Sequence, residues 1–100
     1  MNIYNYTQPN EGEEVIEKLF SKDNITINRI VSNKVADGEW YDQDEDEWLV
    51  LVSGEALLVF EDEDEEIVLL KGDTFYIPRH TKHSVKKTSE DALWLTVHLK

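Results

Sequence analysis

Tyr41, Gln43 and Glu47 are three polar residues that stand just before the apolar segment WLVLV. Side chains two apart on a strand share a face, so Glu47 and Leu49 lie on the same face of a strand through this segment. A strand continued backward without a bulge adds Gln43 and Tyr41 to that face. Because a lone buried carboxylate is costly, we expect a cation, hydrogen-bond donors or a proton at Glu47.

The other acidic residues of this segment fall on the opposite stripe. Asp42, Asp44 and Asp46 are expected to face water, and the second acidic run, EDEDEE, is interpreted as a solvated hairpin turn. Alternating aspartates also open calcium-binding EF-hand loops. Such a loop needs glycine where Glu47 stands and a bidentate acid where Ser53 stands, so this interpretation is excluded.

The composition limits the size and the partners of the protein. The chain has 100 residues, of which 40% are hydrophobic, so we expect one domain with one core and a small pocket. The formal net charge of -12 disfavours nucleic acid and anionic membrane surfaces as partners. Cysteine is absent, so disulfide and thiolate sites are excluded. Without a leader or a long apolar run, we expect a cytoplasmic protein.

Most of the chain carries short strand patterns separated by turn signals. Residues 13–21 predict a short helix, because their four apolar residues fall on one helical stripe. An arm and this helix make up residues 1–24, and residues 25–99 are expected to form an all-β antiparallel sandwich or barrel. The expected strands are residues 25–31, 47–53, 55–61, 66–70, 74–77, 83–87 and 92–99.

Two spaced motifs resemble those of the cupin superfamily. The first cupin motif, G-x5-H-x-H-x3/4-E-x6-G, has its second half at Glu47 and Gly54. The second, G-x5-P-x-G-x2-H-x3-N, fits at Gly72, Pro78 and His83. The phrase WYDQDEDEW looks like a variant found in small uncharacterised cupins. The resemblance extends over nearly the whole chain and implies a double-stranded β-helix, that is, a jelly-roll barrel.

The sequence departs from these motifs at positions that matter for function. The paired metal-binding histidines of the family fall on Tyr41 and Gln43. In the second motif His80 replaces the glycine and Lys87 the asparagine. His80 is expected in a loop at the barrel rim. A ligand set with fewer histidines is richer in oxygen and binds late first-row metals more weakly.

The resemblance implies a divalent metal ion, Zn, Ni, Mn or Fe, held by Gln43, Glu47 and His83. Tyr41 or His98 is the candidate for a fourth ligand. Glu47 and Tyr41 are the candidates for proton transfer, and no organic cofactor is expected. Alternatively, no metal is bound: His83 is a polar core residue hydrogen-bonded to Glu47, and His98 has a structural role.

Three functions stay open at this point. The first is a metal-dependent site that acts on or binds a small oxygenated metabolite. The second is a metal-free small-molecule binding or regulatory module, and the third is a scaffold whose barrel is filled with side chains. Whether the protein is an enzyme is left open. Because the segments WLVLV and ALLVF are apolar on both faces, we expect further cover from a second subunit in a homodimer.

Overall fold

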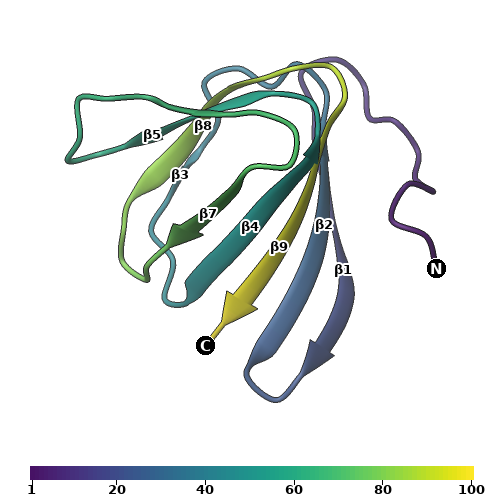
Figure 1. Cartoon of the computed structure of the whole chain (residues 1–100), viewed down its shortest axis with the longest axis horizontal. Coiled ribbons are helices and arrows are strands. Elements are labelled where there is room, and N and C mark those ends of the chain that lie inside the picture. Colours follow the sequence, from purple (N-terminus) through teal and green to yellow (C-terminus); the bar gives the residue numbers. More distant parts are fainter.

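The structure is a computed structural model that describes all residues from 1 to 100, and it consists of strands only (Figure 1). The expected all-β class is therefore confirmed, and no helix is present that could cross a membrane. An irregular arm leads into the first strand. The strands are β1 Glu14–Lys22, β2 Ile25–Ser32, β3 Trp40–Tyr41, β4 Asp46–Ser53, β5 Ala56–Phe60, β6 Ile67–Leu69, β7 Thr74–Ile77, β8 His83–Thr88 and β9 Ala92–Leu99.

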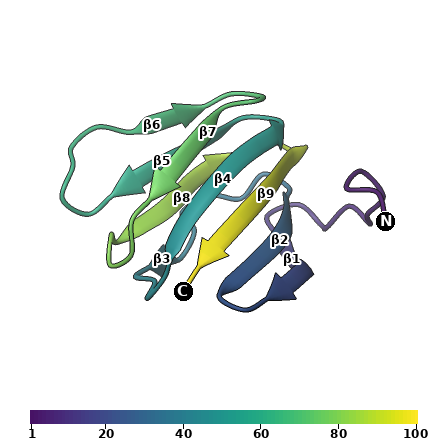
Figure 2. The same cartoon turned by 60° about the horizontal axis from the view of Figure 1, so that its bottom comes forward.

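The strands form two antiparallel sheets packed against each other (Figure 2). The order is β1-β2-β9-β4-β7 in the larger sheet and β3-β8-β5-β6 in the smaller one. Strands far apart in sequence are neighbours, since β9 lies between β2 and β4. Side chains from strands that are distant in the sequence therefore meet between the sheets.

The helix predicted at residues 13–21 is wrong, because residues 14–22 form β1 at the edge of the larger sheet. β1 pairs with β2 along its length, with a register shift between Lys18 and Phe20. This bulge adds one residue, Leu19, and changes the alternation of faces beyond it. The apolar residues therefore have helix-like spacing although the segment is a strand.

The segment from Tyr41 to Glu47 is not one continuous strand, in contrast to the simplest expectation. Tyr41 ends β3, which pairs with β8 in the smaller sheet. Glu47 lies on β4, which pairs with β7 and β9 in the larger sheet. Residues 42–45 cross from one sheet to the other. Tyr41 and Glu47 thus reach the interior from opposite sheets.

The core between the sheets is formed mainly by β4 and β5. The turn that joins these strands contains Gly54, whose φ is +85°. A side chain at this position would place its Cβ 2.7 Å from the Cα of Ala92, so only glycine fits. The buried core residues are Leu49, Leu51, Ala56, Leu58, Phe60, Leu69, Ile77, Ala92 and Trp94.

The outer face of the larger sheet is apolar along one row that crosses all five strands. The pairing registers connect its members in order, from β1 to β7. The two aromatic residues at the β7 end are well exposed, with Trp48 at 41% and Tyr76 at 53% of their full accessible surface. We call this row the outer row; it consists of Phe20, Ile27, Val97, Trp48 and Tyr76.

Candidate functional site

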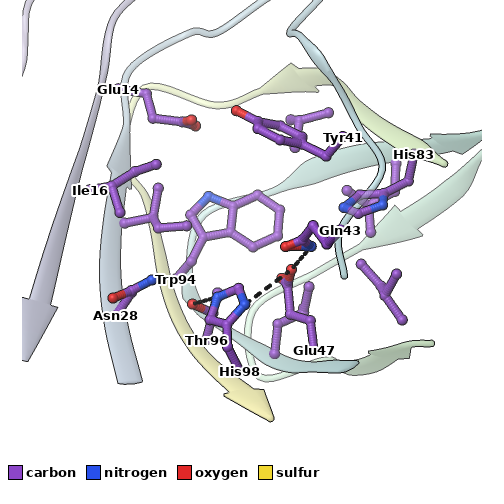
Figure 3. Close-up of a pocket in the computed structure, with 15 residues that line it drawn as sticks. Glu14, Ile16, Asn28, Tyr41, Gln43, Glu47, His83, Trp94, Thr96 and His98 are labelled. Atoms are coloured by element: carbon purple, nitrogen blue, oxygen red, sulfur yellow. Dashed lines mark hydrogen bonds and ion pairs between the residues drawn. The ribbon is translucent and has the colours of Figure 1, made fainter. Parts of the chain in front are cut away.

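A cavity of about 120 Å³ lies between the two sheets (Figure 3). Its volume is of the same order as the cavity of about 150 Å³ that holds a benzene molecule, so it fits a compound of roughly five or six non-hydrogen atoms. Polar and apolar side chains share its wall. The lining residues are Glu14, Ile16, Asn28, Ile30, Tyr41, Gln43, Glu47, Leu49, Leu58, Ile77, His83, Val85, Trp94, Thr96 and His98.

Glu47 projects from β4 into this cavity and is 7% exposed. Its Oε1 accepts a hydrogen bond of 2.7 Å from Nε2 of Gln43. Burial, with a smaller contribution from the nearby carboxylate of Glu45, raises the pKa of Glu47 from 4.5 to about 7. A substantial fraction of Glu47 is thus a neutral acid at pH 7, able to donate or accept a proton.

His98 lies beside Glu47 at the end of β9 and is also buried. Its Nδ1 lies 2.9 Å from Oε1 of Glu45 and 4.0 Å from Oε1 of Glu47. These contacts are close but not aligned as hydrogen bonds, so Nδ1 has no hydrogen-bond partner. Its Nε2 lies 3.0 Å from Oγ1 of Thr96. Burial lowers the pKa of His98, while Glu45 opposes this shift.

His83 begins β8 on the opposite side of the cavity. Its Nδ1 lies 2.8 Å from the carbonyl oxygen of Thr81. Since a carbonyl only accepts, Nδ1 carries the proton and Nε2 has a free lone pair. Burial lowers the pKa of His83, so the neutral imidazole predominates at pH 7. His83 is therefore a proton acceptor that faces the same cavity as the acid Glu47.

Tyr41 and His83 are cross-strand partners on β3 and β8, and their ring centroids are 5.9 Å apart. Burial raises the pKa of Tyr41, and the carboxylates of Glu14, Glu39 and Glu47 add to the effect. The phenol is thus held in its protonated form. It can donate a hydrogen bond to a ligand in the cavity.

The exposed side of the acidic segment is held by the loop between β7 and β8. His80 is exposed, as expected for a rim residue, and its ring nitrogens lie 3.5 Å from Asp42 and from Asp44. Its backbone N donates to the carbonyl of Gln43 at 2.8 Å, which fixes the backbone that carries the Gln43 amide. His80 has φ of +60°, which explains why this motif position is typically glycine.

The structure brings all five sequence-predicted site residues to one cavity: Tyr41, Gln43, Glu47, His83 and His98. Among the tryptophans, only Trp94 lines it. Sequence reasoning missed Glu14, Asn28, Glu45 and Thr96. Alternation along β9 would have found Thr96, because it lies two residues from both Trp94 and His98.

The predicted metal site was compared with this geometry. The anchored Nδ1 of His83 is typical of a metal-binding histidine, since such ligands usually donate their other ring nitrogen to a carbonyl or carboxylate. However, the Gln43 amide donates to Glu47, and no group of three His, Asp or Glu side chains is spaced to hold a metal ion. As arranged, these side chains do not form a histidine and carboxylate metal centre, and a divalent ion would bind Glu47 only after Gln43 releases it.

Comparisons with known proteins identify the family. The model of the cupin domain family matches residues 32–98. One similar crystal structure is that of a protein from Ralstonia eutropha JMP134, described as a candidate mannose-6-phosphate isomerase. The two sequences are 33% identical, and the structures superpose with a TM-score of 0.90 over 100% of this chain and 96% of the Ralstonia chain. No curated protein sequence matched. The chain belongs to the cupin family.

More distant structures share the fold. An RmlC-like cupin family protein of Methanocaldococcus jannaschii with a double-stranded β-helix fold is 22% identical, with a TM-score of 0.77 and coverage of 94% of this chain and 86% of its own. The cobalt(II) complex of HppE with its substrate is 14% identical, with a TM-score of 0.73 and coverage of 94% and 56%. The two packed sheets are thus consistent with the predicted double-stranded β-helix.

Proposed function

We propose that the cavity binds a small oxygenated metabolite and that Glu47 and His83 transfer a proton on it. The observation that carries this proposal is the placement of a buried carboxylic acid and an imidazole with a free Nε2 on one cavity. A pKa of about 7 for Glu47 supports it, because a proton-transfer group works best near the ambient pH.

The proposed reaction is an enolisation next to a carbonyl group. Nε2 of His83 accepts the proton from the carbon beside the carbonyl, and the acid form of Glu47 donates its proton to the carbonyl oxygen, which gives an enediol. His83 then returns its proton to the former carbonyl carbon, while the second hydroxyl of the enediol gives its proton to Glu47 and becomes the new carbonyl. This gives the isomer and restores both residues. Tyr41 and Gln43 are proposed to orient the ligand through hydrogen bonds, which requires only the donors that already face the cavity.

Hydrogen exchange tests this proposal without knowledge of the physiological substrate. The protein is incubated in D2O with dihydroxyacetone and with glyceraldehyde, and loss of the carbon-bound proton signal is followed by NMR. The matched variants are Glu47→Gln, His83→Ala and, as a control, Glu65→Gln in the exposed acidic turn. We expect exchange above the buffer rate that falls roughly 100-fold in the two cavity variants and stays unchanged in the control.

The outcomes separate the candidate functions. Exchange that is unaffected by Glu47→Gln and His83→Ala contradicts the assignment of these residues. Binding of either compound without exchange would instead indicate the metal-free binding or regulatory module. Absence of both binding and exchange would reject short hydroxycarbonyl compounds as ligands.

A divalent ion held by Gln43, Glu47 and His83 is the second candidate, favoured by the anchored ring of His83. Binding would require Gln43 to release Glu47, with Tyr41 or His98 as the fourth ligand. Elemental analysis of protein purified without a histidine tag tests this candidate. A stoichiometric Zn, Ni, Mn or Fe ion, lost in Glu47→Gln, would support it, and no metal with no thermal shift on metal addition would reject it.

A homodimer through the outer row is a further part of the proposal. The row contains no charged residue, so two copies of a chain with net charge -12 can meet there with little repulsion. Trp48→Glu is expected to weaken association at least roughly tenfold by analytical ultracentrifugation. Trp40→Glu alters another well-exposed tryptophan, on β3, and is the control. A monomeric wild type, or a dimer that survives Trp48→Glu, contradicts the proposal.

A further inference from the structure

Three residues mark the place where the cavity meets the surface. Glu14, Tyr41 and Val85 line the cavity and also line a neighbouring surface depression next to Gly38 and Glu39. Figure 3 shows Glu14 and Tyr41 at one side of the cavity and Glu47 with His98 at the other. We call the region around Glu14 and Tyr41 the mouth.

The mouth carries negative charge and no positive charge. Glu14 accepts a hydrogen bond of 2.8 Å from the hydroxyl of Ser32, which holds its carboxylate in place. No lysine or arginine lines the cavity or the depression. The two arginines are engaged elsewhere, since Arg29 contacts backbone carbonyls of the amino-terminal arm and Arg79 pairs with Asp46.

The deep part of the cavity offers polar groups but no countercharge for an anion. Its hydrogen-bonding groups are those of Gln43, Glu47, His83, Thr96 and His98. An ion that enters a small, largely buried site loses much of its hydration, and this cost is recovered only where an opposite charge replaces the water. Hydroxyl and carbonyl groups, in contrast, are well matched by these donors and acceptors.

We infer that the ligand of this cavity is an uncharged hydroxycarbonyl compound or polyol, and that Glu14 at the mouth excludes phosphorylated and carboxylated analogues. The ligand class rests on the proposed function, whereas the exclusion of anions rests on the charges around the mouth. The inference separates this chain from its relative described as a candidate mannose-6-phosphate isomerase, whose named substrate is an anion. Glu14 thus acts as a specificity-determining residue.

Two probes that differ by one phosphate group test the ligand class. Binding of dihydroxyacetone and of dihydroxyacetone phosphate is measured by NMR titration of the wild type, Glu14→Gln and the control Glu65→Gln. We expect the wild type to prefer the uncharged probe by at least roughly tenfold, a preference that shrinks several-fold in Glu14→Gln only. Equal or tighter binding of the phosphate by the wild type, or an unchanged preference in Glu14→Gln, overturns the inference.

Fluorescence quenching tests the exclusion of anions without any ligand. In a Trp40→Phe, Trp48→Phe background, Trp94 is the remaining tryptophan, and it lines the cavity. Acrylamide is uncharged and small, whereas iodide is an anion. We expect acrylamide to quench Trp94 several-fold more strongly, and Glu14→Gln, added to this background, to increase quenching by iodide alone.

Either of two quenching results overturns the role of Glu14. Iodide that quenches Trp94 as well as acrylamide does would show that the mouth admits anions. Failure of both quenchers would show that the cavity admits no solute of this size. If the quenching contrast holds but dihydroxyacetone neither binds nor exchanges, the proposed function fails while the exclusion of anions stands.

Discussion

Asp46 and Glu47 are neighbours in the sequence, yet their carboxyl groups have pKa values shifted in opposite directions. Asp46 points outward, where the backbone N and guanidinium of Arg79 donate to it and lower its pKa. Glu47 points into the cavity, where burial raises its pKa to about 7. The alternation of faces along β4 places one acid at the surface beside a cation and the other in the buried cavity without one.

This difference shows how one acidic segment serves two purposes. The exposed acids fix the loop between β7 and β8 through Arg79 and His80. Glu47 is held by an amide donor instead of a cation, which leaves its proton available for chemistry. Replacing single carboxyl groups therefore separates the structural role of the exposed acids from the functional role of Glu47.

The largest effect is expected for Glu47→Gln, which keeps the shape of the side chain but removes its titratable proton. An acid whose pKa is raised in the folded state favours folding in its protonated form, so its contribution is complete below pH 4.5 and is lost as the pH rises to about 7. At 1.36 kcal/mol per pKa unit, the wild type should lose about 3 kcal/mol relative to Glu47→Gln over this range.

Urea unfolding of both proteins between pH 4 and pH 8 measures this difference. Glu65→Gln removes a carboxylate in the exposed turn and is the control for net charge. A difference between the wild type and Glu47→Gln that does not change with pH would show that Glu47 is not a buried neutral acid.

A smaller effect is expected for Glu45→Gln. The carboxylate of Glu45 raises the pKa of both Glu47 and His98, so its removal should lower both. The loss of stability that Glu47 causes as the pH rises should then be slightly smaller in Glu45→Gln than in the wild type. NMR titration of the His98 ring measures this change, and an unaltered His98 titration would mean that Glu45 does not act on it at 2.9 Å.

The smallest effect, with the opposite sign, is expected for Asp46→Asn. Because the pKa of Asp46 is lowered in the folded state, its stabilisation is present above its ordinary pKa of 3.8 and is lost as the pH falls through the folded value. The variant should have a slightly lower melting temperature than the wild type at pH 7 and the same one at strongly acidic pH. A lower melting temperature at both pH values would point to lost packing instead of lost charge.

Much of the site could be predicted because strand periodicity and two spaced motifs both point to it. Glu47 on the same face as Leu49 follows from alternation alone, and the motif spacing brought His83 to the same cavity. Gln43 and Tyr41 also line the cavity, but not because they continue the strand of Glu47. They arrive from β3 and the crossing segment 42–45, and pairing between distant strands has no local signal in the sequence.

The rest of the site was missed where local spacing was misleading. The bulge in β1 gave its apolar residues a helical spacing, so Glu14 was assigned to a helix and not to the cavity mouth. The left-handed backbone of His80 and its contacts with Asp42 depend on the loop geometry and not on residue type. These features follow from tertiary pairing and could not be derived from the sequence pattern.

Direct titration of the Glu47 carboxyl carbon by ¹³C NMR tests the central claim, with Glu47→Gln used to assign its signal. A neutral acid in the cavity predicts a midpoint near pH 7, against an ordinary value of 4.5. A midpoint at or below the ordinary value would show that Glu47 is ionised under physiological conditions. In that case a cation, and not a proton, would be its partner in the cavity.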